Sequence, residues 1–198
     1  IGHNIRLGQI PAFRTSERDA HKYVLEVTLK GMYETEGKSE EVCSTNHWDF
    51  WIYPKSTLHA LREDTPSDIY VTDSLDAKAE QVLNDGGKVL VTAAGKVTYG
   101  KDIVQQFTPV FWNTSWFKMR PPHTTGLYIE NYHPLFRNFP TGYHSDLQWW
   151  ELVNRKQVMQ FTEFPEDFQP IVQSIDTWFL SRKIGMLFEA TVGNGRLM

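Results

Sequence analysis

Alternating apolar and polar residues predict strands in the first part of the chain. Residues 5–10 (IRLGQI) and 23–30 (YVLEVTLK) follow a period of two, which is typical of strands with one buried face. Residues 46–54 (NHWDFWIYP) predict a third strand that stops at Pro54, because proline has no amide hydrogen to donate to a ladder. Residues 31–46 between them are polar, acidic and contain glycines, which predicts an exposed loop. Strands joined in this way predict the C-terminal part of an antiparallel β-sandwich.

The pattern changes after Pro54. Residues 69–73 (IYVTD) form a short apolar run, and residues 75–85 (LDAKAEQVLND) repeat apolar positions with helical spacing, with Ser74 placed to cap the helix. A glycine pair then ends the helix, and residues 88–93 (KVLVTA) form a continuous apolar strand of the kind that parallel sheets bury. Strand, helix and strand in this order predict a βαβ unit with two parallel strands.

The remaining segments are also typical of an α/β domain. They are a strand at 126–130 (GLYIE), a helix at 146–153 (DLQWWELV), a strand at 170–175 (PIVQSI) and a hairpin over 185–198. We therefore divide the chain into residues 1–54, which supply β-sandwich strands, and residues 55–198, which form an α/β domain, so that the whole chain is α+β. Strand-like sequence near both ends leads us to expect a piece excised from a larger protein.

Composition argues against several classes of partner. The 198 residues are 40% hydrophobic and 22% charged, which are the proportions of a folded chain. The formal net charge of −4, with scattered basic residues, argues against a nucleic-acid partner, because phosphate contacts need a concentrated basic face. No apolar run approaches the about 20 residues that a membrane span needs, and the first residues are not typical of a signal peptide.

The sequence offers little for catalysis. Cys43, the single cysteine, falls in the predicted polar loop, and Ser115 lies among bulky residues without the glycine that a nucleophile elbow needs. The seven histidines are spread without the spacing of a zinc site, and the glycine pattern of a dinucleotide-binding loop is absent. We therefore expect no catalytic residue, no metal and no cofactor in this chain.

Aromatic clusters are more informative. Residues 111–117 (FWNTSWF) and 148–150 (QWW) mix rings with amide and hydroxyl groups, a composition found both in sugar sites and in protein cores. In residues 46–54, alternation places rings on both faces, which favours a seam between the strand's own sheet and a neighbouring domain. Trp149 and Trp150 point about 100° apart on a helix, so we expect one in the core and the other partly exposed.

Several of these segments resemble one known family. NHWDFWIYP, LNDGGKVLVTA, FTPVFWNTSWF, PPHTTGLYIENYHPLFRNFPT and PIVQSIDTWFLSRKIGMLFEATVGNGRLM are similar to the C-terminal region of large bacterial glycoside hydrolase family 2-type proteins. These are the β-galactosidase-like enzymes and their sugar-binding relatives. The most specific segments are 133–141 (HPLFRNFPT) and 183–189 (KIGMLFE), and the resemblance covers almost the whole chain. It implies a β-sandwich end followed by a class I glutamine amidotransferase-like, flavodoxin-like α/β domain without a nucleophile.

The resemblance also implies a function. The chain would be a non-catalytic accessory module of a multidomain glycoside hydrolase that degrades carbohydrate, with a structural or a sugar-binding role. Its partners would be the upstream domains, including a TIM barrel with the catalytic carboxylates, and the parent protein would be periplasmic or secreted. The alternative is an independent hydrolase of amidotransferase-like or esterase type, which would need a nucleophile at a strand-to-helix elbow.

A carbohydrate site, if the module has one, should lie beyond the carboxyl ends of the parallel strands, where α/β domains bind ligands. The segment that follows residues 88–93 and the start of the helix at 146–153 are expected to reach this rim. An oligosaccharide would there meet Trp112, Asn113, Trp116, Tyr143, His144 and Trp149.

Overall fold

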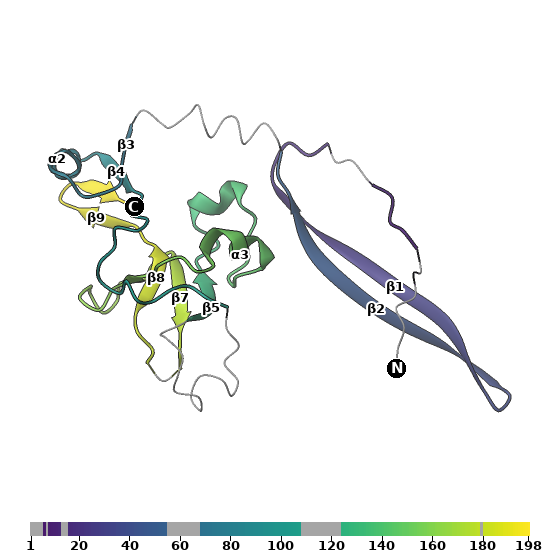
Figure 1. The fold of residues 1–198 in the computed structure, drawn as a ribbon. Coiled ribbons are helices and arrows are strands. Elements are labelled where there is room, and N and C mark those ends of the chain that lie inside the picture. The colour runs from purple at the N-terminus through teal and green to yellow at the C-terminus, as the bar shows by residue number, and fades with distance from the viewer. Residues whose placement is uncertain (1–5, 7, 13–15, 55–67, 108–123, 179) are drawn as a thin grey trace. The chain divides into compact units, whose positions relative to one another are not determined.

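The computed structural model describes residues 6, 8–12, 16–54, 68–107, 124–178 and 180–198 (Figure 1). The chain divides into two compact units, residues 1–55 and residues 56–198. Strands are the main regular structure in both units, and most of their pairings are antiparallel. Within the described ranges, no helix is long and apolar enough to cross a membrane.

The first unit is built on one long antiparallel hairpin. Strands β1 (His21–Thr35) and β2 (Lys38–Ile52) pair along their whole length, from His21 opposite Ile52 to Thr35 opposite Lys38. Glu36 and Gly37 form the turn, and both have positive φ angles, 36° and 85°. The twist of a two-residue turn with two positive φ angles matches the right-handed twist of the paired strands. The pairing can therefore extend to Thr35 and Lys38, the residues on either side of the turn.

The hairpin corrects two expectations from the sequence. Residues 31–46, predicted as a loop, belong to β1, the turn and β2, and residues 8–10 of the predicted first strand are not in a strand. The physical reason is that alternating apolar and polar residues indicate a strand with one buried face. A strand that is exposed on both faces has an extended backbone but needs no such alternation. The distal half of the hairpin is exposed on both faces, so its strands are formed without an apolar pattern.

The register of the hairpin gives it two different faces. Residues opposite each other in an antiparallel pair project to the same face, so Tyr23 lies with Phe50 and Leu25 with Trp48. The rings of Tyr23 and Phe50 stack with centroids 5.5 Å apart. We call this side the apolar hairpin face; its apolar members are Tyr23, Leu25, Val27, Leu29, Tyr33, Val42, Trp48, Phe50 and Ile52, and its polar members are His21, Thr35, Lys38, Glu40, Ser44 and Asn46.

The opposite side of the hairpin is mainly polar. Its members include Lys22, Glu26, Thr28, Lys30, Glu41, Thr45, His47 and Asp49, with Val24, Met32 and Trp51 as apolar members. Lys22 pairs with Asp49 at 2.7 Å and also lies over the ring of Trp51, 5.7 Å from its centroid. Within β2, the aromatic stretch at 46–54 therefore places Trp48 and Phe50 on the apolar hairpin face and Trp51 on the opposite face. Its interpretation as a seam between domains stays a prediction.

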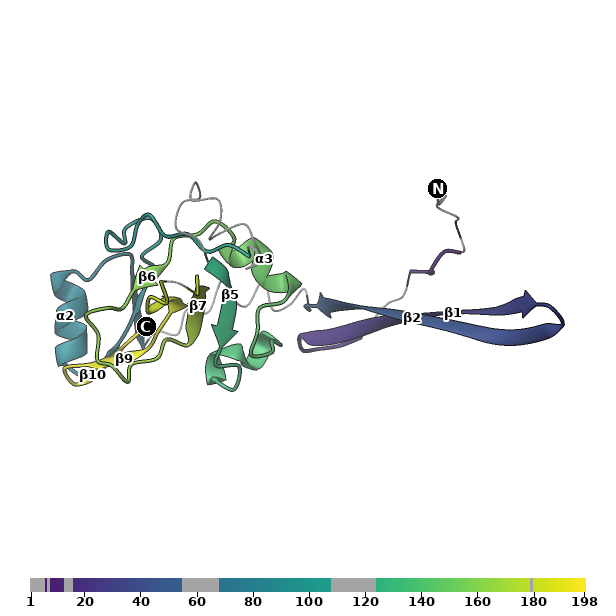
Figure 2. The ribbon, with the colours of Figure 1, turned by 90° about the horizontal axis from the view of Figure 1, so that it is seen from below.

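The second unit contains a four-stranded mixed sheet in the order β3-β4-β10-β9. Strand β3 (Ile69–Thr72) leads to helix α2 (Ala77–Asn84) and then to β4 (Lys88–Val91), and β3 and β4 are parallel. Strand β10 (Gly195–Leu197) pairs parallel with β4 and antiparallel with β9 (Ala190–Val192). The predicted βαβ unit is confirmed. Figure 2 shows α2 beside the strands of this sheet, where Ala79 and Leu83 are buried.

The cap of helix α2 differs from the prediction. Asp76, not Ser74, is the N-cap, and its Oδ1 accepts a hydrogen bond from the backbone N–H of Ala79 at 2.7 Å. The hydroxyl of Tyr70 donates to the other oxygen of Asp76 at 3.1 Å. Serine and aspartate are both common N-cap residues, so residue type alone does not identify the cap. Asp76 is the cap because it immediately precedes Ala77, where the helix begins.

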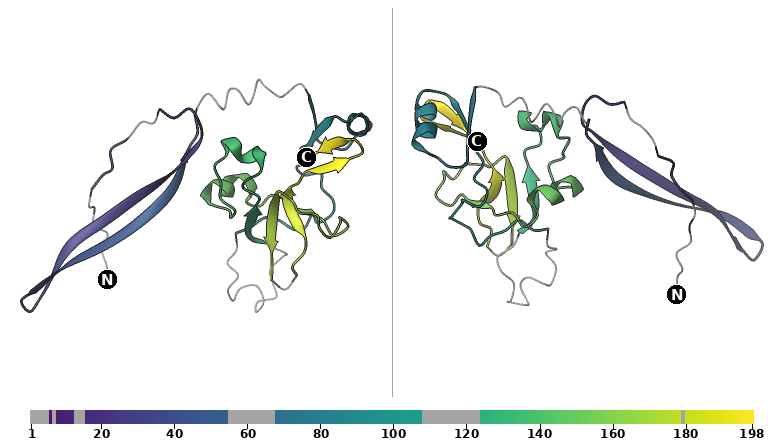
Figure 3. Two further views of the ribbon diagram at one scale, coloured as in Figure 1. Left: turned by 180° about the vertical axis from the view of Figure 1, so that it is seen from behind. Right: turned by 45° about the horizontal axis from the view of Figure 1, so that its top comes forward.

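A second four-stranded sheet is entirely antiparallel, in the order β5-β7-β8-β6. Its strands are β5 (Thr124–Ile129), β7 (Val172–Asp176), β8 (Ile184–Leu187) and β6 (Met159–Gln160). Figure 3 shows the chain passing from β8 in this sheet to β9 in the other. The prediction of one hairpin over 185–198 is therefore wrong for residues 185–187, which belong to β8 in a different sheet. The antiparallel pair of β9 and β10 confirms the rest of this hairpin.

The largest core cluster lies under β5 and β7. It joins Leu127 and Ile129 of β5 to Phe136 of the 3₁₀ helix η1 (Pro134–Asn138) and Trp149 of helix α3 (Leu147–Val153). Trp149 is 6% exposed whereas Trp150 is 47% exposed. The prediction that one of these tryptophans lies in the core is confirmed, since neighbouring positions on a helix point in different directions.

The turn of the hairpin generates a prediction. Gly37→Ala should weaken the hairpin by about 1 kcal/mol, because alanine is strained at positive φ, whereas Glu36→Asn should strengthen it, because asparagine tolerates this region. Gly31→Ala is the control, since Gly31 has an ordinary φ and open space for a side chain. Amide hydrogen exchange of β1 and β2 is the measurement. Equal exchange rates in Gly37→Ala and Gly31→Ala would contradict the turn geometry.

The cap of α2 generates a second prediction. Asp76→Ala should lower the free energy of unfolding by about 1 kcal/mol, because the amide of Ala79 loses its acceptor. Ser74→Ala should change it by less than about 0.5 kcal/mol. Urea unfolding of both variants measures the difference, and a larger loss for Ser74→Ala would show that the cap is assigned to the wrong residue.

Candidate functional site

Three of the six residues predicted for a carbohydrate site, Trp112, Asn113 and Trp116, lie outside the described residues, as does Ser115. The structure brings two of the other three together. Tyr143 and His144 are both exposed, and their ring centroids are 4.3 Å apart.

Trp149 is placed differently from these two residues. Its indole Nε1 donates to the Thr141 hydroxyl at 2.8 Å, and its ring meets the rings of Phe136 and Phe139 edge to face. These contacts use the ring for packing on the core, so little of it faces solvent.

The segment that carries Tyr143 and His144 extends the second sheet beyond β5. The backbone N–H of Ile129 donates to the carbonyl of Tyr143 at 2.9 Å, and the N–H of Ser145 donates to the carbonyl of Leu127 at 3.4 Å. Tyr128 thus lies opposite His144 in a non-hydrogen-bonded pair, the kind of pair in which side chains on one face come closest.

Tyr128 has a second neighbour across the sheet, because it pairs with Gln173 of β7 on its other side. His144, Tyr128 and Gln173 therefore form one row on the face opposite the buried Leu127 and Ile129. We call these three residues the Tyr128 row. Sequence reasoning missed Tyr128 and Gln173, although alternation within GLYIE already places Tyr128 on the face opposite its apolar neighbours.

The Tyr128 row combines a ring with hydrogen-bonding groups. Tyr128 is 48% exposed, and the strand register places His144 and Gln173 opposite it on its two sides. Beside it, Gly126 carries no side chain, and a Cβ there would be 3.5 Å from the Ser145 hydroxyl oxygen. The exposed ring of a tyrosine can stack on the flat C–H face of a sugar. Its own hydroxyl, an imidazole and an amide can form hydrogen bonds with the hydroxyl groups of the sugar.

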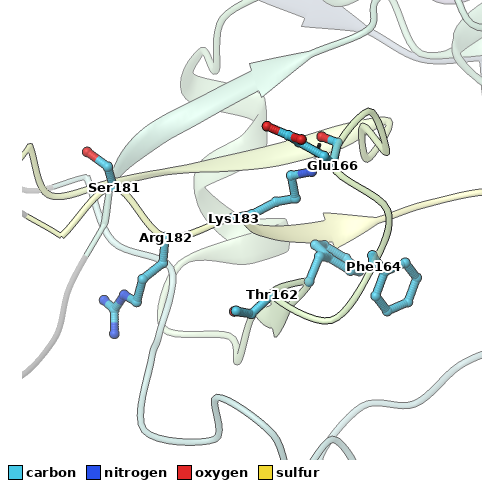
Figure 4. A pocket seen from close by; sticks show the side chains of 7 residues that line it. Thr162, Phe164, Glu166, Ser181, Arg182 and Lys183 are labelled. Atoms are coloured by element: carbon cyan, nitrogen blue, oxygen red, sulfur yellow. Dashed lines mark hydrogen bonds between the residues drawn. The ribbon is translucent and has the colours of Figure 1, made fainter.

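A pocket of about 380 Å³ lies elsewhere in the second unit, between the segment after β6 and the segment before β8 (Figure 4). Figure 4 shows Lys183 pointing toward Glu166, and its Nζ donates to the carbonyls of Pro165 at 3.1 Å and Glu166 at 2.6 Å. The lining residues are Phe161, Thr162, Phe164, Glu166, Ser181, Arg182 and Lys183.

The second cation of this pocket is also engaged. Arg182 donates to both carboxylate oxygens of Asp176, at 2.8 and 3.0 Å. Burial by itself would raise the pKa of Asp176, but hydrogen bonds from the Arg182 side chain and from the backbone N–H groups of Arg182 and Thr177 hold that pKa below its usual value. Both cations therefore hold the pocket walls in place, which leaves them less available for an anionic ligand.

A third polar cluster links the two sheets of the second unit. Nε2 of His133 lies 3.2 Å from Glu189, and Arg196 on β10 donates to the other oxygen of Glu189 at 2.6 Å. The hydrogen bond from Arg196 is the main reason why the pKa of Glu189 is lowered. Nδ1 of His133 accepts from the backbone N–H of Leu135, so the ring donates through Nε2. The cluster thus fixes the start of η1 against β10.

Metal binding and nucleophilic chemistry find little support in the described parts of the chain. The described residues contain no group of three or more His, Cys, Asp or Glu side chains that could hold a metal ion. Cys43 is exposed in β2 of the hairpin, opposite Lys30, and not at a strand-to-helix turn.

Comparison with known proteins identifies a family for this chain. No curated protein matches the chain. The family model DUF8487, described as a domain of unknown function, matches residues 70–198. The match runs from β3 to the end of β10 and includes the Tyr128 row. Since it covers more than half of the sequence, the chain belongs to the DUF8487 family.

Proposed function

We propose that the chain is a non-catalytic accessory module of a multidomain glycoside hydrolase, in which the hairpin joins a β-sandwich and the second unit serves as a structural or sugar-binding domain. The apolar hairpin face is the observation that carries this proposal. Five of its members, Val27, Leu29, Tyr33, Val42 and Trp48, are each more than two-fifths exposed.

The hairpin supports a structural role because it is incomplete by itself. A two-stranded hairpin is at best marginally stable in water, and it needs further strands or another layer on its apolar face. In an antiparallel β-sandwich, one face of each sheet packs on the other sheet and the opposite face meets solvent. The apolar and polar sides of this hairpin fit that arrangement, and the missing layer would come from an upstream domain of the parent chain.

The finer fold of the second unit is part of the same proposal. The βαβ unit of β3, α2 and β4, extended by the parallel strand β10, is consistent with a class I glutamine amidotransferase-like, flavodoxin-like core. The antiparallel sheet of β5, β7, β8 and β6 departs from a doubly wound parallel sheet. The proposal treats this sheet as an addition that carries the Tyr128 row.

Carbohydrate is the ligand that suits the Tyr128 row, because the row pairs a ring with hydrogen-bonding groups. Tyr143 and His144 from the sequence-based site belong to this surface, and Tyr128 and Gln173 complete it. Location in the periplasm or outside the cell, and a TIM-barrel partner upstream, follow only from the resemblance to glycoside hydrolase family 2-type proteins.

The alternative is an independent hydrolase of amidotransferase-like or esterase type. That function needs a nucleophile with an activating base within hydrogen-bond reach. Cys43 lies in the first unit, in the hairpin, and Ser115 lies outside the described residues. The accessory role is preferred because the amphipathic hairpin supports it directly.

The structural role is tested by comparing this chain with a longer protein that includes its upstream sequence. Trp48→Glu should lower the stability of the longer protein by more than about 2 kcal/mol, because a charge would be buried, and should change this chain by less than about 0.5 kcal/mol. Cys43→Glu on the polar side is the control; Cys43 is exposed and lies opposite Lys30, so this change should be near neutral in both. Equal effects of Trp48→Glu in the two proteins, measured by denaturant unfolding, would refute a covered apolar hairpin face.

The sugar-binding role is tested by titrating this chain with galactose-, glucose- and rhamnose-containing oligosaccharides in a calorimeter. We expect binding at millimolar ligand that Tyr128→Ala weakens by about tenfold, or ~1.4 kcal/mol. Tyr132→Ala is the matched control, because Tyr132 is almost fully exposed and lies outside the Tyr128 row. An absence of heat with every sugar, or the same loss in both variants, would leave the module with a structural role alone.

A further inference from the structure

A second cavity lies in the unit of residues 56–198, where the two sheets meet. It has a volume of about 210 Å³. Every residue that lines it is apolar, and three of them are methionines: Met159, Met186 and Met198. This cavity shares no lining residue with the Tyr128 row or with the pocket of Figure 4.

The cavity lies at the carboxyl ends of the three parallel strands of the first sheet. Val91 and Ala93 line it at the end of β4, and Leu197 and Met198 line it at the end of β10. Leu75, which follows β3, is the exposed member of the lining. In sheets with parallel strands, ligands bind in the crevice at this edge.

The opposite wall comes from the antiparallel sheet. Met159 of β6 and Met186 and Leu187 of β8 face the parallel strands across the cavity, and Phe188 follows them. Position and lining are independent observations, because the first comes from strand direction and the second from side-chain chemistry. Both indicate a binding site for a small apolar group.

The lining also selects the kind of apolar group. Methionine sulfur makes favourable contacts with aromatic rings, and its flexible side chain adapts to their shape. The ring of Phe188 adds an aromatic partner. A cavity of ~150 Å³ lined by apolar side chains is large enough for benzene, so this cavity can hold one ring with a small substituent.

We propose that the cavity between the carboxyl ends of β3, β4 and β10 and the strands β6 and β8 binds a monocyclic aromatic compound. The ring packs between the three methionine side chains and Phe188, and a polar substituent points out past Leu75. This site does not depend on the carbohydrate-binding role proposed for the Tyr128 row.

The test uses this chain with methyl-labelled methionine and p-cresol as the ligand, followed by NMR. We expect saturable ring-current shifts of the methyl signals of Met159, Met186 and Met198 at millimolar p-cresol. Met32 on the exposed hairpin is the internal control and should not shift. The non-aromatic analogue 4-methylcyclohexanol should bind at least about tenfold more weakly.

Two matched variants check the location of the site. Ala93→Leu places extra volume in the cavity and should weaken p-cresol binding by about tenfold or more, whereas Thr92→Leu, at the neighbouring exposed position outside the lining, should not. The proposal is overturned if p-cresol shifts none of the three cavity methionines, if it shifts Met32 equally, or if 4-methylcyclohexanol binds as well. Equal effects of the two variants would also overturn it.

Discussion

The pairing of β10 with β4 is the constraint on which the unit of residues 56–198 depends. It inserts β10 between β4 and β9, and it joins residues 88 and 89 to residues 196 and 197 at the end of the family match. Gly195 allows this insertion, because a Cβ there would lie 2.5 Å from the carbonyl oxygen of Gly87 and 2.7 Å from Leu83. The same pairing brings Leu197 under α2 and sets Met198 at the carboxyl edge of the sheet.

Other features of this unit follow from the position of β10 in the sheet. Arg196 on β10 donates a hydrogen bond to Glu189, and Glu189 also contacts His133 at the start of η1. These contacts hold the segment that follows β5 against β10. Helix η1 places Phe136 against Trp149, and α3 covers the buried face of β5. The outer face of β5 is then free to present Tyr128 between His144 and Gln173. Both proposed binding surfaces thus lie on a framework that the pairing of β4 with β10 holds together.

The sequence predicts local elements in this protein better than it predicts long-range pairing. The βαβ unit was predictable because a buried parallel strand is a continuous apolar run and α2 repeats with helical spacing. The part of the hairpin at residues 31–46 was not predictable, because exposed strands need no alternation of apolar and polar residues. The Tyr128 row depends on pairing of the segment 143–145 with β5, and the methionine-lined cavity combines residues from segments far apart in the chain. Local periodicity carries no information on either arrangement.

The proposed accessory role requires that another layer of the parent protein covers the apolar hairpin face. Amide hydrogen exchange tests this requirement most directly, by comparing β1 and β2 in this chain with the same strands in a longer protein that includes the upstream sequence. We expect the longer protein to slow exchange along both strands by at least about tenfold and to shield Trp48 from a soluble fluorescence quencher. Unchanged exchange rates together with an equally accessible Trp48 would contradict the covered hairpin face.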